Sequence, residues 1–190
     1  MASSSNGQLS APSLSQQRLF ITSHNTDAKA IVHSQNDFQW HTFDNDQIAF
    51  SLLYSTSQFP PDLNNDADIT AHAALLEKPM RLVNDSGTFL RCVDFAPSYK
   101  CAMHRTQSLD YGIVLAGSID MLLDSGELHS LKAGDVIVQR ATNHQWVNTS
   151  DTDWARMMFV LQAVKPLMVG ETKLEEDLGE GADLLPESQV

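Results

Sequence analysis

A series of short alternating segments between residues 103 and 148 most constrains what this chain can fold into. The segments 119–123 (IDMLL) and 127–131 (ELHSL) flank an Asp-Ser-Gly turn, which is typical of a β-hairpin. A Lys-Ala-Gly-Asp turn then leads into the apolar run 136–138, which is short enough to be a buried strand. Short strands separated by turns every few residues predict a β-sandwich or a β-barrel.

The rest of the chain fits one domain, because 190 residues lie within the usual range of domain sizes. Alternating or apolar segments predict further strands over 19–22, 30–33, 38–43, 48–54, 89–95 and 154–163. Helical turns are expected over 68–78 and 171–178. We therefore expect a flexible tail (1–17), N-terminal strands and a loop that pack on the barrel or on a dimer partner (18–84), a barrel core (85–165) and a solvated acidic tail (166–190).

Charge and composition exclude several classes of function. The chain has 24 acidic and 12 basic residues, a formal charge of −12, which argues against binding nucleic acid or an anionic membrane. No apolar run approaches the roughly 20 residues of a membrane span. Two cysteines, Cys92 and Cys101, make no disulfide framework, and the N-terminus lacks the pattern of a signal peptide, so we expect a cytoplasmic protein. The sequence contains no glycine-rich phosphate loop, so we expect no nucleotide cofactor.

Two motifs within the alternating region carry the chemistry. The first reads HRT at 104–106 followed by LDYG at 109–112, and the second reads HQWVN at 144–148. Together they resemble the cupin family, and in particular the small single-domain cupins of fungal and bacterial specialised-metabolite pathways. The resemblance implies an all-β fold, the double-stranded β-helix or jelly-roll barrel, with N-terminal extension strands and short helical segments. It places Thr106 where the family carries a second histidine, and Asp110 where it carries a glutamate.

Three readings of His104, Asp110 and His144 remain open on the sequence alone. Two histidines and a carboxylate could hold a divalent metal (Fe, Mn, Ni or Zn) in a facial arrangement, although Thr106 is a poor replacement for an imidazole ligand. Inside an apolar barrel the same three residues could instead act as general acid and base, since burial raises a carboxyl pKa and lowers that of histidine. In the third reading, Asp110 and His144 only hydrogen-bond to each other.

The resemblance implies a tailoring enzyme that acts on a small, largely apolar organic molecule. We expect a lyase or isomerase that catalyses dehydration, decarboxylation or cyclisation, and keep an Fe(II)-dependent dioxygenase and a non-catalytic binding protein as alternatives. A homodimer is the family expectation. The residues expected to contact the substrate are Arg91, Arg105, Thr106, Arg140 and Trp146.

Overall fold

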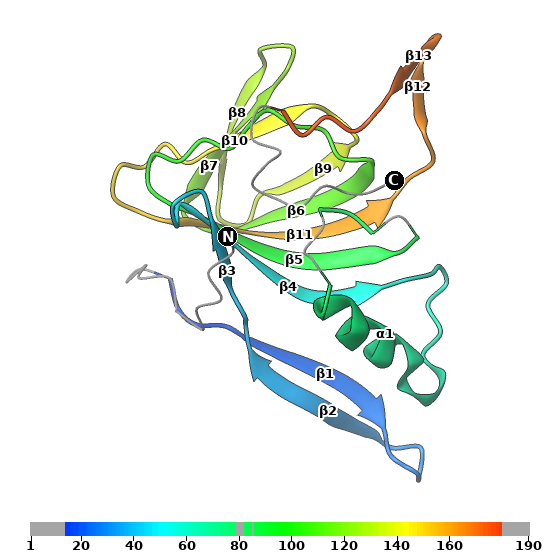
Figure 1. Cartoon of the computed structure of the whole chain (residues 1–190). Helices are drawn as coiled ribbons and strands as arrows, with labels where there is room; N and C mark the ends of the chain where they lie inside the picture. Colours follow the sequence, from blue (N-terminus) through cyan, green and yellow to red (C-terminus); the bar gives the residue numbers. More distant parts are fainter. Residues whose placement is uncertain (1–13, 79–81, 85, 180–190) are drawn as a thin grey trace.

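The structure, a computed structural model, describes residues 14–78, 82–84 and 86–179, and two β-sheets form its barrel (Figure 1). The larger sheet has six strands in the order β3-β4-β5-β11-β6-β9. These are β3 (His41–Phe43), β4 (Ile48–Thr56), β5 (Thr88–Phe95), β11 (Ala155–Ala163), β6 (Ser108–Ala116) and β9 (Val136–Arg140). The smaller sheet has three strands in the order β10-β7-β8, which are β10 (His144–Val147), β7 (Ser118–Leu123) and β8 (Leu128–Lys132). This arrangement confirms the predicted all-β jelly-roll class.

Side chains from both sheets meet in one apolar core. Ile119 of β7 and Trp146 of β10 belong to the same buried cluster as Phe89 of β5 and Phe159 of β11. Burial alternates along β4 because successive side chains point to opposite faces of a strand. Burying each large apolar side chain contributes roughly 1.5–3 kcal/mol, so this shared core holds the two sheets together.

Two turn residues fix the connections at the end of the barrel. Gly117 joins β6 to β7 with a φ of +74°, and a Cβ there would lie 2.9 Å from the carbonyl oxygen of Trp154. The buried Asn148 donates its side-chain amide to the carbonyl oxygens of Phe95, Ala96 and Asp153, at 3.1, 3.0 and 2.8 Å. Asn148 of the second motif is therefore a structural residue that ties the turn after β10 to the end of β5.

An ion pair lies inside the larger sheet. Arg156 of β11 faces Asp94 of β5, and its Nε and one terminal nitrogen each donate to a carboxylate oxygen at 2.6 Å. The guanidinium also lies 4.9 Å from the ring centroid of Trp40. Both charged side chains are buried, so each depends on the other to offset the cost of losing water.

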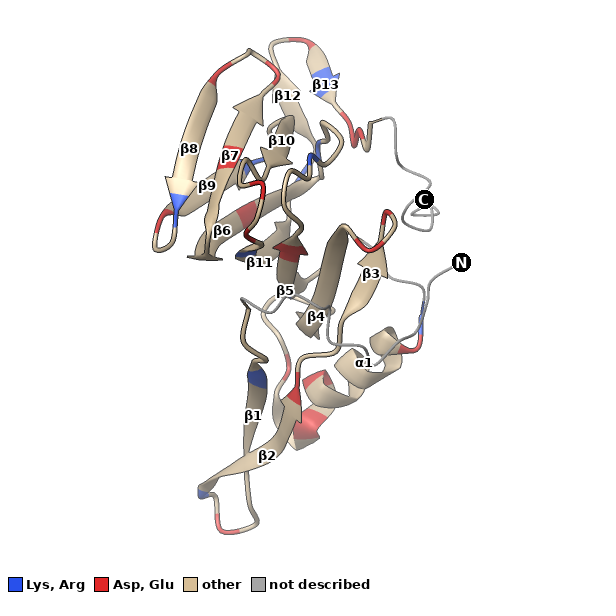
Figure 2. Cartoon of the chain, turned by 90° about the vertical axis from the view of Figure 1, so that its left-hand side faces the viewer, with Lys and Arg blue, Asp and Glu red and all other residues tan. Residues whose placement is uncertain are grey.

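The N-terminal region contributes a separate hairpin and two barrel strands. The antiparallel hairpin β1 (Arg18–His24) and β2 (Ala30–Asp37) projects away from the barrel beside the helix α1 (Ala67–Leu76), whose first turn contains Asp68 (Figure 2). A short 3₁₀ helix, η1 (Asn64–Asp66), precedes α1. The strand predicted over 38–43 is shorter than expected, since only His41–Phe43 is extended while the Phe38 and Trp40 rings pack into a buried cluster.

The C-terminal region differs most from its prediction. A hairpin of β12 (Leu167–Val169) and β13 (Thr172–Leu174) stands where part of a solvated tail was expected, and the helix predicted over 171–178 is absent from these described residues. Of the predicted tails, 1–13 and 180–190 lie outside the described residues. No helix in the described ranges is long and apolar enough to cross a membrane.

Candidate active site in the barrel cavity

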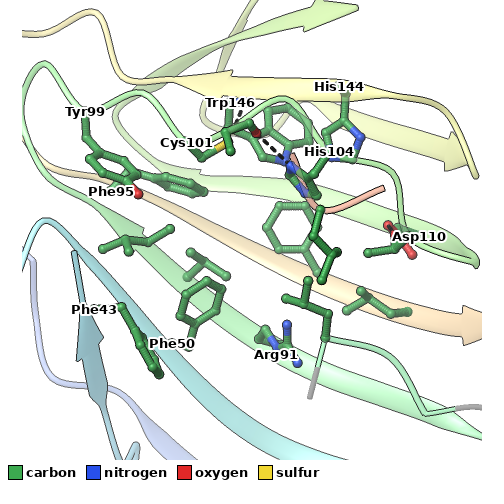
Figure 3. A pocket seen from close by; sticks show the side chains of 18 residues that line it. Phe43, Phe50, Arg91, Phe95, Tyr99, Cys101, His104, Asp110, His144 and Trp146 are labelled. Atoms are coloured by element: carbon green, nitrogen blue, oxygen red, sulfur yellow. Dashed lines mark hydrogen bonds between the residues drawn. The ribbon is translucent and has the colours of Figure 1, made fainter. Parts of the chain in front are cut away.

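A cavity of about 130 Å³ lies between the two sheets. Its walls come from β3, β4, β5, β6 and β11 of the larger sheet, from β10 and from the loop 99–106 that precedes β6, with Leu82 and Leu178 in addition. In Figure 3 the polar group Asp110 lies at the opposite end of the cavity from the rings of Phe43, Phe95 and Tyr99. The polar side chains that line it are those of Arg91, His104, Thr106, Asp110 and His144.

The two histidines are paired by their backbones. The N–H of each residue donates to the carbonyl oxygen of the other at 2.9 Å, and their ring centroids lie 4.4 Å apart. The Nδ1 atoms lie 2.9 Å from the carbonyl oxygens of Ala102 and Thr142, for His104 and His144 respectively. Because a carbonyl oxygen can only accept, both Nδ1 atoms carry the proton, and each neutral ring keeps an acceptor lone pair on Nε2.

Burial keeps both rings neutral at physiological pH. Desolvation lowers the pKa of His104, and desolvation together with the nearby His104 ring lowers the pKa of His144 to about 3. Trp146 packs edge-on against His144 with 5.2 Å between ring centroids, so the two side chains share one face of β10 as the sequence predicted. The pair can therefore accept hydrogen bonds from a bound hydroxyl group.

Asp110, on β6, is a carboxyl group that is only 5% exposed. Burial raises its pKa to about 6, against the opposing effects of Ser108, Arg91 and Thr106. Its Oδ2 accepts a long hydrogen bond of 3.5 Å from Thr106, whereas its Oδ1 has no hydrogen-bond partner among the described residues. A buried carboxyl with an open oxygen and a pKa near neutrality is a candidate general acid or base.

Arg91, on β5, places a positive charge in the same cavity. Its guanidinium carbon lies 5.4 Å from the ring centroid of Phe50 and 5.6 Å from that of Phe89, and the residue is 2% exposed. Burial lowers the pKa of Arg91 to about 10, while the charge of Asp110 opposes that shift. The group is thus still cationic at neutral pH and is close enough to Asp110 for the two charges to interact.

Aromatic side chains form much of the cavity wall. Phe43 of β3 and Phe50 of β4 pack edge to face with 5.5 Å between ring centroids, and Trp146 lies 5.8 Å from Phe159. Cys101 also lines the cavity, where burial raises the pKa of its thiol to about 12, so it is not a thiolate nucleophile. The arrangement fits a ligand with an apolar body and an oxygen-bearing end.

The three expected metal ligands do not form a close cluster among the described residues. No three His, Cys, Asp or Glu side chains within the described residues gather closely enough to hold a metal ion. His104 precedes β6 and pairs with His144, while the Thr106 hydroxyl occupies the missing histidine position and bonds to Asp110. The donors that come together are two imidazole nitrogens, fewer than the three protein ligands of a catalytic zinc or facial iron site.

Two of the residues predicted to contact substrate lie elsewhere. Arg105 points away from the cavity and donates from Nε to the carbonyl oxygen of Glu175 at 2.8 Å. Arg140 is exposed at the end of β9 and does not line the cavity. In an extended chain, successive side chains point to opposite faces. The neighbouring residues Thr106 and Gln139 are buried, so Arg105 and Arg140 point away from the barrel interior. His104, Asp110, His144, Arg91, Thr106 and Trp146 do meet in the cavity.

Sequence reasoning missed the lining residues that come from distant segments. Phe43 and Phe50 are N-terminal to the predicted barrel core, and Leu178 lies in the predicted solvated tail. The aromatic alternation near Phe43 was the available signal for a buried face. A lone leucine in an acidic segment gave none.

No family model matches the chain, but several proteins are similar over most of its length. It is 40% identical over 96% of its length to "Phomopsin biosynthesis cluster protein D" of Diaporthe leptostromiformis, of which it covers 96%. It is 37% identical over 87% of its length to "Cupin-domain-containing oxidoreductase virC" of Hypocrea virens, of which it covers 86%. It is 33% identical over 92% of its length to "Oryzines biosynthesis cluster protein J" of Aspergillus oryzae, of which it covers 98%.

Solved structures resemble the chain more distantly. The polyketide cyclase RemF from Streptomyces resistomycificus matches with a TM-score of 0.42 at 17% identity, over 64% of this chain and 68% of that chain. KdgF from Halomonas sp. matches with a TM-score of 0.42 at 16% identity, over 65% of this chain and 95% of that chain.

Proposed function

The chain belongs to the cupin superfamily, and on that basis we propose that its barrel cavity is the active site of a small-molecule tailoring enzyme of specialised metabolism. The reaction is of the lyase or isomerase type: a proton is moved on a largely apolar substrate that carries a carbonyl group. Similarity to proteins named for biosynthesis clusters supports the metabolic setting. The aromatic lining supports the apolar character of the substrate.

The observation that carries the proposal is the state of Asp110. Its pKa of about 6 lies close to working pH, its Oδ1 has no partner among the described residues, and it lines the cavity. General acid–base catalysis is most efficient when the pKa of the catalytic group is near the operating pH. Most buried polar side-chain atoms have a hydrogen-bond partner, so the open oxygen of Asp110 favours a role beyond structure.

The cavity residues divide the proton transfer among them. Ionised Asp110 takes a proton from the carbon next to the substrate carbonyl, and the C–H electron pair moves onto the carbonyl oxygen as an enolate. Arg91 stabilises that negative charge, because a cation in a cavity of low dielectric constant acts strongly on developing charge.

The protonated Asp110 then completes the reaction in one of two ways. Where the enolate is conjugated with a C=C bond of the substrate, returning the proton to the far carbon of that bond moves the double bond and gives an isomer. Delivering it to a departing β-hydroxyl releases water and leaves a double bond, which is a dehydration. The neutral Nε2 atoms of His104 and His144 accept hydrogen bonds from substrate hydroxyl groups, and so orient the substrate.

The test is a screen of aryl ketones and β-hydroxy aryl ketones in D₂O, read by mass spectrometry. The proposal predicts deuterium uptake beside the carbonyl, or loss of water, in the wild-type protein. It predicts loss of both in Asp110→Asn, and retention in Asp124→Asn, which changes an exposed carboxylate in a turn. Equal rates in Asp110→Asn and wild type would contradict the proposal.

An oxidoreductase is the second candidate, because relatives 37% identical to the chain are named cupin-domain-containing oxidoreductases. The same screen separates the two, since an oxidoreductase changes substrate mass by hydrogen or oxygen atoms and consumes O₂ or another oxidant. Metal analysis of protein purified without chelator adds a second readout. Stoichiometric iron that is lost in His144→Ala would favour this candidate. Ligand that is bound and released unchanged would indicate a binding protein.

A further inference from the structure

The segment 174–179, here called the C-terminal strap, is bound to the loop that carries two of the site residues. After β13 the chain (red in Figure 1) returns to the barrel, where the N–H of Arg105 donates to the carbonyl oxygen of Asp177 at 2.6 Å. The N–H of Asp177 donates back at 2.9 Å. Gln107 adds a bond of 2.6 Å to the carbonyl oxygen of Leu174. These bonds join the strap to the residues on either side of Thr106.

The end of the strap fits closely against the same loop. Gly179 has a φ of +68°, and a Cβ at that position would collide with the carbonyl oxygen of Met103. Asp177 accepts a hydrogen bond of 3.0 Å from the N–H of Gly179 through its Oδ1. The turn therefore holds the intervening residue, Leu178, in one position.

Leu178 is the residue of the strap that enters the site. It lines the cavity and is partly buried, whereas Glu175, Glu176 and Asp177 before it are exposed. The other lining residues belong to barrel strands or to the loop 99–106, with the exception of the half-buried Leu82. Leu178 thus stands on the boundary between the cavity and solvent.

We infer that Leu178 closes the cavity at the strap and determines the width of the substrate that can bind. The inference rests on the proposed function only in taking the ligand to be largely apolar. Arg105 is then a positioning residue: its Nε bond to the Glu175 carbonyl oxygen holds the strap, and it has no contact with substrate. Charged residues on the outer side of the strap and one leucine on its inner side fit a cover over an apolar cavity.

The first experiment measures access to the cavity without any ligand. Trp146 lines the cavity and is 3% exposed, so acrylamide should quench its fluorescence slowly in the wild-type protein. Leu178→Ala is expected to increase quenching, and the increase should disappear when Trp146→Phe is added. The matched control is Met168→Ala, which trims an exposed side chain of β12. Equal quenching in Leu178→Ala and wild type would overturn the inference.

The second experiment measures width with benzoate, naphthoate and anthracene carboxylate, whose carboxylates can pair with Arg91. Leu178→Trp is expected to lower the affinity for naphthoate by about tenfold relative to the affinity for benzoate, since overfilling a packed site costs about that much affinity. Leu178→Ala is expected to raise the affinity for anthracene carboxylate relative to the affinity for benzoate. Unchanged ratios in both variants would overturn the inference.

The two experiments separate its failure from failure of the proposed function. If the wild-type protein binds none of the three carboxylates, the proposed ligand class is wrong, and the acrylamide result alone decides whether Leu178 closes the cavity.

Discussion

Replacing Asp110 by asparagine is expected to stabilise the folded protein, by an amount that grows with pH. The folded environment raises the pKa of this carboxyl from 3.8 to about 6, chiefly through burial. Between those two values the folded chain holds a proton that the unfolded chain has released. Stability from this group therefore falls as pH rises, and the loss is complete above the folded pKa.

The size of the effect follows from the two pKa values. The raised pKa of Asp110 lowers the free energy of unfolding by about 1.5 kcal/mol at pH 5 and by about 3 kcal/mol at pH 8. Asparagine has nearly the same shape and no charge, so Asp110→Asn should remove this loss. The folded pKa of about 6 already contains the attraction of Arg91 for ionised Asp110, so both values include that interaction.

The assay is urea denaturation followed by tryptophan fluorescence at pH 5, 6.5 and 8. The difference in unfolding free energy between Asp110→Asn and wild type should increase by about 1–1.5 kcal/mol from pH 5 to pH 8. Asp124→Asn, in an exposed turn, should show no such trend. A difference that stays constant with pH would refute the reasoning, because it would mean that Asp110 ionises at its ordinary pKa in the folded protein.

Three further predictions concern the fold and assembly. Arg156→Met leaves Asp94 buried without its partner and should cost about 3–5 kcal/mol in urea denaturation; a loss under about 1 kcal/mol would match an exposed pair instead. Gly117→Ala should cost over about 1 kcal/mol, and more than Gly126→Ala, because both have positive φ but only Gly117 has backbone within 3 Å of the added Cβ. We propose a homodimer through the β1–β2 hairpin, since an isolated hairpin is marginal and Val32 is 57% exposed; light scattering should give twice the chain mass for wild type and the chain mass for Val32→Glu, and a wild-type monomer would contradict it.

Local patterns predicted the barrel because its turns are encoded by adjacent residues. The hairpin of β7 and β8 follows from the Asp-Ser-Gly turn and from alternation on either side of it. His144 and Trp146 face the cavity together because residues two apart share one face of a strand. Both features depend on one short continuous segment of sequence, which is the range over which strand periodicity is informative.

The features that sequence could not give depend on contacts between distant segments. His104 was expected on one strand with Asp110, but it precedes β6 and pairs with His144 of the smaller sheet, and the three expected metal ligands form no close cluster among the described residues. The role of Arg105 depends on its hydrogen bond to the strap, at Glu175, which is 70 residues away in the sequence. Leu178 lies among acidic residues, which predict a solvated tail. No local pattern there indicates that the chain returns to the barrel.

The pH dependence of proton exchange tests the central claim most directly. The substrate is an aryl ketone that the screen identifies. The rate of its deuterium uptake should rise with pH through a single ionisation with a pKa near 6, where Asp110 becomes a base. Asp110→Asn should lose both the rate and this ionisation, while Asp124→Asn should keep them. A rate that is independent of pH between 5 and 8, or an ionisation that persists in Asp110→Asn, would contradict the account, because the proton would then be moved by another group.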